Sequence, residues 1–272
     1  MAYARLSDGS LDYQPCRYGS SKLVFRGPVV DINRDYVAFL GGSETYGKFI
    51  ERPFPDIVGA RLGLPALNLG CVSAGVDVYH EDPTVLELAR LAKLRVVQVA
   101  GAQNLSNRMY TVHPRRNDRF VKASRLLTVL YPEIDFTEIH FTGHLITALR
   151  ATSTERFELV VEELTSAWQA RMAKFLKRIG GPTVLLFLSP RGADETAMLL
   201  QAEPRLIDAE LLKSMESYAT AIVHASTPPS GEKAGASGMI FSELEAAAAA
   251  SLPAPDVHMQ IAEAIISALK KS

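Results

Sequence analysis

The sequence has few of the features that mark secreted, metal-binding or nucleic-acid-binding proteins. It contains two cysteines, Cys16 and Cys71, in 272 residues, and neither has the C-x-x-C or cysteine–histidine spacing of a redox or metal site. Its 29 Lys and Arg nearly balance 30 Asp and Glu, so the formal net charge is −1. Such a chain has no overall field that attracts nucleic acid or an anionic membrane. We therefore expect two ordinary thiols, no metal and no cofactor.

Long apolar runs are also absent. The N-terminal stretch has no apolar core of signal-peptide length, and no run elsewhere is long enough to span a bilayer. The sequence therefore predicts a cytoplasmic protein that contacts neither membrane nor nucleic acid. Hydrophobic residues make up 47% and charged residues 22%, which is ordinary for a globular protein. The length suffices for one large α/β domain with a substantial core.

Short apolar segments alternate with stretches of helical periodicity. The segments rich in leucine or β-branched residues and bounded by glycine or proline favour buried strands, at 36–41, 66–70, 95–101 and 183–189. Helical spacing occupies 53–63, 82–94, 155–181 and 203–219. Strands that alternate with helices predict an α/β fold with a mainly parallel sheet, covered by helices on both faces.

Two segments fall outside this alternation. Residues 1–34 favour an irregular N-terminal extension to a single domain of residues 35–272. Residues 102–150 form an insertion after the third predicted strand, partly loop and partly helix. An insertion of this length on an α/β scaffold usually shapes a binding site or a dimer contact. The sequence therefore leaves open whether the chain forms a homo-oligomer.

The stretch YVAFLGGSETYGKF, residues 36–49, supports two chemical interpretations. Residues 42–48 satisfy all but the last position of the phosphate-binding pattern G-x-x-x-x-G-K-[ST]. Phe49, however, stands where a magnesium-binding hydroxyl belongs, and Glu44 would put a carboxylate into a cradle for polyanions. A nucleotide-binding protein is therefore the weaker interpretation.

The second interpretation makes Ser43 a nucleophile at the exit of the first strand, where open α/β sheets bind ligands. Acyl transfer by a serine needs a base and donors for the oxyanion. Gly70 follows the second predicted strand and Asn104 the third, so both fall at the same edge of the sheet. Near the C-terminus, PAPDVHMQ puts Asp256 and His258 at the start of the last predicted helix.

These four blocks, in this order, resemble those of the SGNH (GDSL-type) hydrolase superfamily, from about residue 36 to the C-terminus. The resemblance implies a flavodoxin-like three-layer α/β/α sandwich, in agreement with the alternation of strands and helices. It also implies that Ser43 is the nucleophile and His258 the general base. The backbone N–H groups of Ser43 and Gly70, with Nδ2 of Asn104, would then line the oxyanion hole.

The sequence departs from the family pattern at three points. Gly42 replaces the aspartate of G-D-S, Leu105 follows Asn104 where the family has aspartate, and Asp256 stands two rather than three residues before His258. Three arrangements stay open at the last block. Asp256 orients the imidazole, or Ser43 and His258 work as a dyad, or the site has lost catalysis.

The insertion contains a dense basic run, RMYTVHPRRNDRF. Its basic residues are Arg108, His113, Arg115, Arg116 and Arg119. One interpretation is a solvated loop or a set of intramolecular salt bridges. The other is recognition of an anionic substrate, since the planar guanidinium suits carboxylate, sulfate or phosphate. One loop is too small a footprint for nucleic acid.

The sequence thus predicts a serine hydrolase that acts on an ester of a small molecule or glycan, with anionic groups bound by the 108–119 run. The alternatives on the same fold are a non-hydrolytic carbohydrate- or anion-binding protein and a transferase acting on an anionic glycan. His140 and His144 have i, i+4 spacing, but they lack the glutamate of the zinc pattern H-E-x-x-H, so we predict no metal there.

Overall fold

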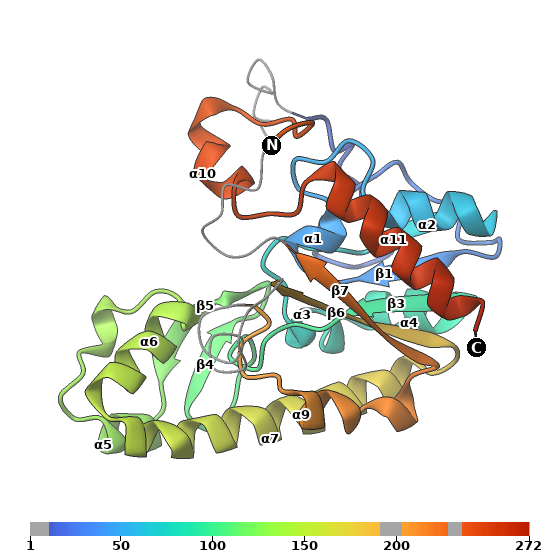
Figure 1. The fold of residues 1–272 in the computed structure, drawn as a ribbon. Helices are drawn as coiled ribbons and strands as arrows, with labels where there is room; N and C mark the ends of the chain where they lie inside the picture. The colour runs from blue at the N-terminus through green and yellow to red at the C-terminus, as the bar shows by residue number, and fades with distance from the viewer. Residues whose placement is uncertain (1–10, 191–202, 228–235, 272) are drawn as a thin grey trace.

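The fold is built on five parallel strands. The computed structural model describes residues 11–190, 203–227 and 236–271. The strands are β1 (Val37–Leu40), β2 (Ala66–Asn68), β3 (Leu94–Gln98), β6 (Thr183–Pro190) and β7 (Ala221–Thr227), in the order β2-β1-β3-β6-β7 (Figure 1). This is the doubly wound order of flavodoxin-like folds, in which the direction of winding reverses between β1 and β3. The predicted α/β fold with a mainly parallel sheet is confirmed.

The strands form here because their residues are apolar on both faces. All four residues of β1 are buried. Ala38 and Leu40 belong to the core on one side of the sheet, and Val37 and Phe39 to the core on the other. A parallel strand covered on both faces has this continuous apolar character rather than an alternating one.

Helices form a layer on each face of the sheet. On one face lie α2 (Phe54–Leu62) and α11 (Pro255–Leu269), which contact each other. On the other lie α3 (Val76–His80), α4 (Pro83–Leu91) and the long α7 (Thr154–Ile179). Trp168 of α7 is buried and donates its indole N–H to the carbonyl of Ala100 at 2.9 Å, so α7 also fixes the segment after β3.

The insertion after β3 contains the predicted loop and helices together with a hairpin that the sequence analysis did not find. The antiparallel hairpin consists of β4 (Tyr110–His113) and β5 (Arg116–Ala123). It is followed by α5 (Arg125–Leu130), the 3-10 turn η1 (Phe136–Glu138) and α6 (Thr142–Thr152). These elements lie together at one end of the molecule (Figure 1).

Two features of the C-terminal half differ from the sequence-based predictions. The strand β7 was not predicted. The helix expected over 203–219 is wrong in extent, because the structure has only the five-residue α9 (Ala209–Lys213) and the 3-10 turn η2 (Glu216–Tyr218) there. The alanine-rich stretch 245–251 contains the short α10 (Ala246–Ala249), which directly follows the 3-10 turn η3 (Glu243–Glu245).

Residues 11–34 hold the loop that joins α1 to α2. Residues 11–34 contain no helix or strand, only a bridge between Cys16 and Phe25. The buried Arg26 donates to the carbonyls of Gly47 at 2.7 Å and Glu51 at 2.8 Å. Both cysteines are buried and unpaired with each other.

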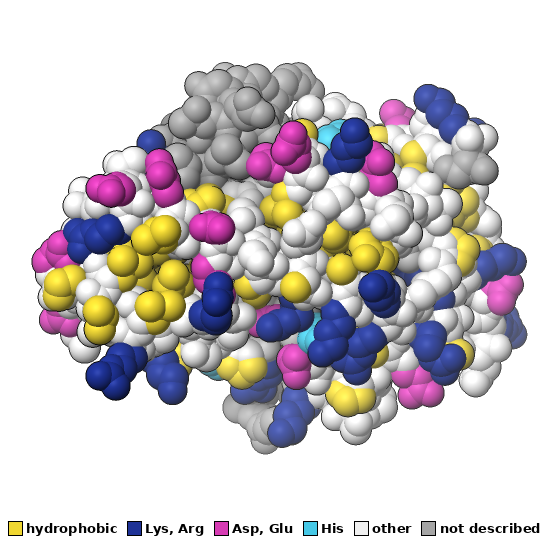
Figure 2. Space-filling model, turned by 90° about the horizontal axis from the view of Figure 1, so that it is seen from below, with side chains coloured by type: hydrophobic (Ala, Val, Ile, Leu, Met, Phe, Trp, Pro, Cys, Tyr) yellow, Lys and Arg dark blue, Asp and Glu magenta, His cyan; other side chains and the backbone are white. Residues whose placement is uncertain are grey.

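The outer face of the helical layer that includes α7 carries mixed chemistry. Lys and Arg side chains gather near its middle, and hydrophobic side chains gather at one end (Figure 2). Exposed hydrophobic residues of α5 and α7 are Leu126, Val129 and Leu159. No helix within the described ranges is both long and apolar enough to cross a bilayer.

Candidate functional site

Ser43 lies at the carboxyl edge of the sheet, where it begins the short helix α1 (Ser43–Tyr46). The backbone N–H of Ser73 donates to its Oγ at 3.4 Å, which is a long hydrogen bond. As the first residue of a helix, Ser43 has a backbone N–H with no intrahelical acceptor. No other acceptor for this N–H is found among the residues that the structure describes, so the group can bind a ligand.

Close packing explains the glycine that precedes this turn. A Cβ atom on Gly41 would lie 2.2 Å from Oγ1 of Thr45 and 2.5 Å from Oε1 of Gln98. These are distances that real Cβ atoms do not show, so only glycine fits. The result is a tight exit from β1 that brings Ser43 against the ends of the neighbouring strands.

The same stretch does not form a phosphate cradle. Residues 43–46 form one helical turn, and Gly47 ends it in the left-handed conformation with φ 71°. The ammonium of Lys48 lies over the ring of Phe49, 4.5 Å from its centroid, rather than facing the backbone of the turn. The nucleotide-binding alternative gains no support from this geometry.

The loop after β2 lies against α1, and the N–H group through which it reaches Ser43 is not that of Gly70. The N–H of Gly70 donates to Oδ1 of Asn68 at 2.9 Å, so it is already bonded within the protein. The N–H of this loop that reaches Ser43 is that of Ser73. Sequence reasoning missed Ser73 because nothing in its neighbours marks it.

Asn104 joins the same group of loops. Its Oδ1 accepts a hydrogen bond from Oγ1 of Thr142 at 2.7 Å, which leaves the Nδ2 of the amide as a donor with no acceptor among the described residues. A Cβ atom on Gly75 would lie 2.2 Å from the carbonyl oxygen of Asn104, so the 73–75 loop and Asn104 are in contact. Segments that follow β1, β2 and β3 therefore meet at the point where the winding of the sheet reverses.

The tip of the hairpin is fixed to the 73–75 loop by Asn117. Its backbone N–H donates to the carbonyl of Ser73 at 3.1 Å. Its fully buried side chain accepts from the N–H of Gly75 at 3.0 Å and donates to the carbonyl of His113 at 3.0 Å. The basic hairpin tip is thus attached to the loop that contacts Ser43.

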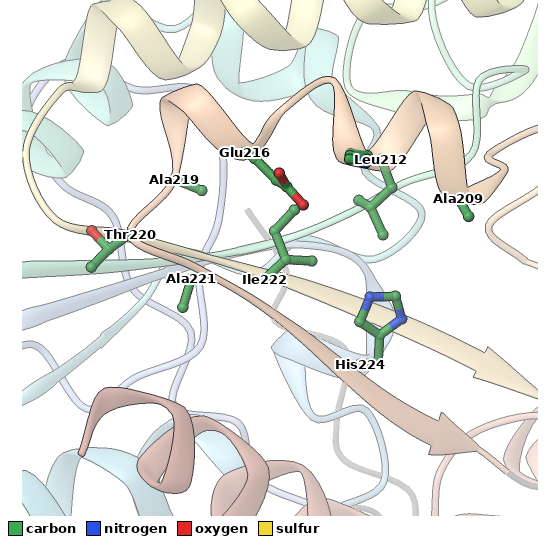
Figure 3. A pocket seen from close by; sticks show the side chains of 9 residues that line it. Ala209, Leu212, Glu216, Ala219, Thr220, Ala221, Ile222 and His224 are labelled. Carbon is green, nitrogen blue, oxygen red and sulfur yellow. The ribbon is translucent and has the colours of Figure 1, made fainter. Parts of the chain in front are cut away.

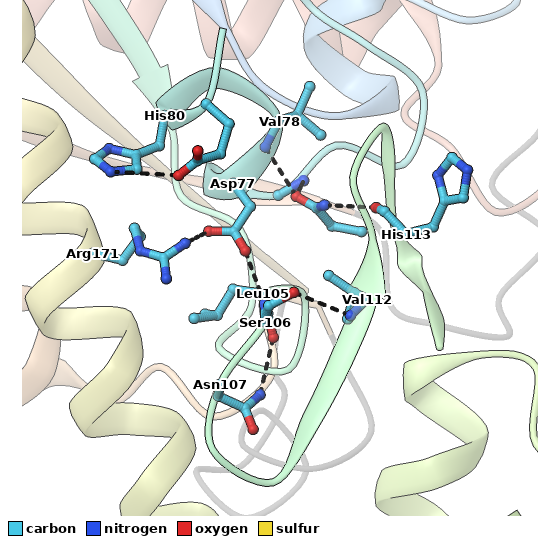
Figure 4. A network of polar contacts seen from close by, with 12 residues as sticks. Asp77, Val78, His80, Leu105, Ser106, Asn107, Val112, His113 and Arg171 are labelled. Atoms are coloured by element: carbon cyan, nitrogen blue, oxygen red, sulfur yellow. Dashed lines mark hydrogen bonds and ion pairs between the residues drawn. The ribbon is translucent and has the colours of Figure 1, made fainter. Parts of the chain in front are cut away.

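The base of the hairpin is held by a second polar network (Figure 4). The buried carboxylate of Asp77 pairs with Arg171 and accepts the N–H of Ser106 at 2.9 Å. Oγ of Ser106 accepts the N–H of Val112 at 3.2 Å. These contacts link α3, α7 and β4, so they orient the whole insertion relative to the sheet.

Three of the five predicted substrate-binding residues contact another side chain of the protein. Arg108 pairs with the buried Glu163; burial raises the pKa of that carboxyl, but hydrogen bonds from Arg108 outweigh it and bring the pKa below its usual range. Arg116 lies 3.4 Å from Asp118. The guanidinium of Arg119 lies 5.3 Å from the centroid of Phe141.

The other two residues stand at the hairpin turn. Nδ1 of His113 accepts the backbone N–H of Arg115 at 3.2 Å. Arg115 is exposed, and within the described ranges its guanidinium has neither a hydrogen-bond nor an ion-pair partner. Of the five residues, Arg115 is therefore the one best placed to bind an anion.

His258 is a packed core residue in this structure. It is 1% exposed, its ring stacks on Phe54 with centroids 5.8 Å apart, and its Nδ1 accepts the N–H of Phe54 at 3.1 Å. Burial, helped by the charge of Arg26, lowers the pKa of His258 to about 3. The imidazole is therefore neutral, and its proton lies on Nε2 because Nδ1 is an acceptor.

The predicted catalytic pair is not joined in this arrangement. In the part of the chain that the structure describes, no hydrogen bond connects His258 to Ser43 or to Asp256. Asp256 is exposed at the first turn of α11. The imidazole instead supplies an acceptor for the first N–H of α2, which has no side-chain cap of its own.

A pocket of about 500 Å³ lies elsewhere, between α9, η2 and β7 (Figure 3). Leu212, Glu216, Ile222 and His224 point into it. Because β7 is the outermost strand, two positions from β3, this pocket is not part of the site at Ser43. Among the described residues, no group of three or more His, Cys, Asp or Glu side chains is arranged to hold a metal ion.

The strand order and the loops that meet at its reversal define a doubly wound α/β protein with a candidate site at the switch point. The chain belongs to the family described as Domain of unknown function (DUF6473), whose model matches residues 1–272. No curated protein matches the chain. Among solved structures it is similar to the lipase Lip_vut3 from a goat rumen metagenome, with 12% identity and a TM-score of 0.47 over 86% of this chain and 97% of that chain. A similarity of this size leaves the activity to be inferred from the site itself.

Proposed function

We propose that this protein is an SGNH-type serine hydrolase in which Ser43 attacks an ester bound between the ends of β1 and β3. The observation that supports this most is the convergence of Ser43, the N–H of Ser73 and the Asn104 segment at the switch point. Ligands of open α/β sheets bind in that crevice. A serine that begins a helix there combines a hydroxyl with a backbone N–H that has no acceptor among the described residues.

The chemistry follows from these groups. Oγ of Ser43 bonds to the acyl carbon, and the carbonyl oxygen becomes an oxyanion stabilised by the N–H of Ser43 and Nδ2 of Asn104. The alcohol then leaves with a proton, and water releases the acid from the acyl-enzyme. A well-placed oxyanion donor contributes about 3 to 4 kcal/mol to such a step.

The resemblance assigns the proton transfer to His258, which requires a local rearrangement. Nε2 carries the proton while Nδ1 accepts from Phe54, so the ring has no free lone pair for the serine. The imidazole must release the Phe54 N–H and move its proton to Nδ1. Leaving the buried N–H of Phe54 without its acceptor costs about 1–3 kcal/mol, and the ring of His258 also gives up its stacking on Phe54.

The substrate is an ester of a small molecule or glycan that carries an anionic group. Arg115 supports this part of the proposal, because it is exposed, unpaired within the described residues and two positions before Asn117, which holds the hairpin to Ser73. An arginine there suits a carboxylate, sulfate or phosphate on the substrate.

A second candidate function is binding of an anionic glycan or similar ligand without hydrolysis. The contact between His258 and Phe54, together with the exposed Asp256, favours it, since neither residue is hydrogen-bonded to Ser43 in this arrangement. In that case the same crevice and the same hairpin tip hold the ligand, and the hydroxyl of Ser43 serves as a hydrogen-bonding group.

One experiment separates the two. Purified wild type, Ser43→Ala and the control Ser217→Ala, an exposed serine on η2, are compared with p-nitrophenyl esters and with sulfated and carboxylated sugars. Hydrolysis requires that Ser43→Ala lose turnover on the order of 10⁴–10⁶-fold while the control is unchanged. Retained hydrolysis in Ser43→Ala contradicts the proposal. Sugar binding without hydrolysis by the wild type establishes the second candidate.

A further inference from the structure

We propose that Gln98 is a positioning residue of this site, which fixes the backbone on both sides of Ser43; this inference rests on the proposed function. Gln98 is the last residue of β3. Its Oε1 accepts the N–H of Gly42 at 3.0 Å and the hydroxyl of Thr45 at 2.6 Å. Its Nε2 donates to the carboxylate of Glu44 at 2.9 Å. One amide therefore bonds the residue before Ser43 and the two residues after it.

The turn that carries Ser43 needs this external support. α1 has only four residues, and its N-cap Gly42 offers no side chain to hold the first turn. Helices of this length are unstable on their own, because nucleation is costly. The buried Thr45 and the N–H of Gly42 are fixed instead by the side chain from β3. The rigid sheet thus sets where Oγ and the N–H of Ser43 point.

Gln98 also restrains a charge next to the nucleophile. Glu44 directly follows Ser43, and its carboxylate is held by Nε2 of Gln98. Released from that bond, the carboxylate is free to approach the N–H groups at the start of α1, where carboxylates are favoured. Those N–H groups are the ones that a substrate oxyanion needs, so a freed Glu44 would compete with it.

A separate anchor holds the neighbouring residues, which isolates the role of Gln98. The hydroxyl of the buried Tyr79 accepts the N–H groups of Gly41 and Cys71, both at 3.1 Å, and donates to the carbonyl of Gly41 at 2.5 Å. Burial keeps the pKa of Tyr79 well above its usual range, so the phenol remains a donor. Tyr79 therefore fixes the exit of β1, and Gln98 fixes the turn itself.

The test exchanges donor and acceptor. The variants are Gln98→Met, which has similar length but no hydrogen bonds; Gln98→Glu, which keeps the acceptor but faces Glu44; and the double variant Gln98→Glu/Glu44→Gln, which restores the pairing with the groups swapped. The readouts are the rate at which a fluorophosphonate probe labels Ser43, kcat and KM for a p-nitrophenyl ester, and Tm.

We expect Gln98→Met and Gln98→Glu to be labelled about 100-fold more slowly, since a misplacement of about 1 Å has an effect of this size. The loss should fall on kcat rather than KM, and the double variant should recover labelling to within about tenfold of wild type. The inference is overturned if folded Gln98→Met is labelled like the wild type, or if the double variant is as slow as Gln98→Glu. If Gln98→Met does not fold, the comparison of Gln98→Glu with the double variant Gln98→Glu/Glu44→Gln tests the inference instead. A wild type without labelling overturns the proposed function, and this inference with it.

Discussion

Ser43 and His258, the two halves of the predicted catalytic pair, lie in opposite environments. Ser43 is half-buried at the meeting point of three loops, and the residues around it are tied to β3 and α3 by Gln98 and Tyr79. His258 is buried between α11 and α2, and both its ring face and its Nδ1 are used by Phe54. Ser43 is therefore held in place by hydrogen bonds around it, whereas His258 is part of the packing between two helices.

This difference has a chemical consequence. A general base works best when its pKa is near the operating pH. With its pKa lowered to about 3, His258 in its present place is a weak proton acceptor at neutral pH. Under the proposed mechanism, turnover requires that the start of α11 move away from Phe54.

The largest effect is expected at His258. His258→Asn keeps an acceptor near the position of Nδ1 but cannot act as a base, so kcat for ester hydrolysis should fall on the order of 10⁴-fold or more. Thermal unfolding followed by circular dichroism monitors the loss of the buried ring. His224→Asn, at the exposed histidine of β7, is the matched control. A kcat within tenfold of wild type would show that His258 only packs.

The acid stability of the protein should report the burial of the same histidine. The unfolded chain binds a proton at His258 below about pH 6.5, whereas the folded chain binds it only near pH 3. The unfolded state therefore holds more protons between these values, so the free energy of unfolding falls as the pH decreases from 6.5 towards 3. At pH 4.5 the contribution of this one residue is about 2–3 kcal/mol.

Urea unfolding at pH 7 and pH 4.5 measures this contribution of His258 to the free energy of unfolding. His258→Asn should lose less stability between the two pH values than the wild type does, by about 2–3 kcal/mol, because the variant has no proton to bind. An identical loss in both proteins would mean that the imidazole is accessible to water and already relaxed away from Phe54.

A smaller effect is expected at the hairpin tip. Arg115→Ala should weaken binding of sulfated or carboxylated ligands by about tenfold, the low end for a charged hydrogen bond at an exposed position. Added salt should shrink the difference, and hydrolysis of neutral esters should stay the same. Lys122→Ala, an exposed cation at the other end of β5, is the control in isothermal titration calorimetry. Equal losses in both variants would indicate a general charge effect rather than a site.

The smallest effect is expected at Asp256. Because it is exposed and makes no hydrogen bond to His258, Asp256→Asn should change kcat/KM by no more than about twofold, as surface substitutions usually do. A hundredfold loss would show that Asp256 reaches the imidazole in the catalytic arrangement.

Much of the sheet could be predicted from the sequence, because buried parallel strands are continuous apolar runs and Ser43 follows one of them directly. The hairpin could not be predicted, because β5 carries charged residues at exposed positions and its pairing with β4 is irregular at Val112. The contact of His258 with Phe54 joins residues 204 positions apart and leaves no local pattern. The role of Gln98 cannot be predicted from the sequence for the same reason, because its hydrogen-bond partners lie in the turn that follows β1.

The identity of the residue that a fluorophosphonate probe modifies in the wild type tests the proposed role of Ser43 most directly. Ser43 combines a hydroxyl with an N–H that has no acceptor among the described residues, so we expect one adduct per chain, found on the peptide that contains Ser43 and absent from Ser43→Ala. Peptide mapping by mass spectrometry gives the answer without knowledge of the substrate. An adduct on another residue, or none at all, would contradict the claim that Ser43 is the nucleophile.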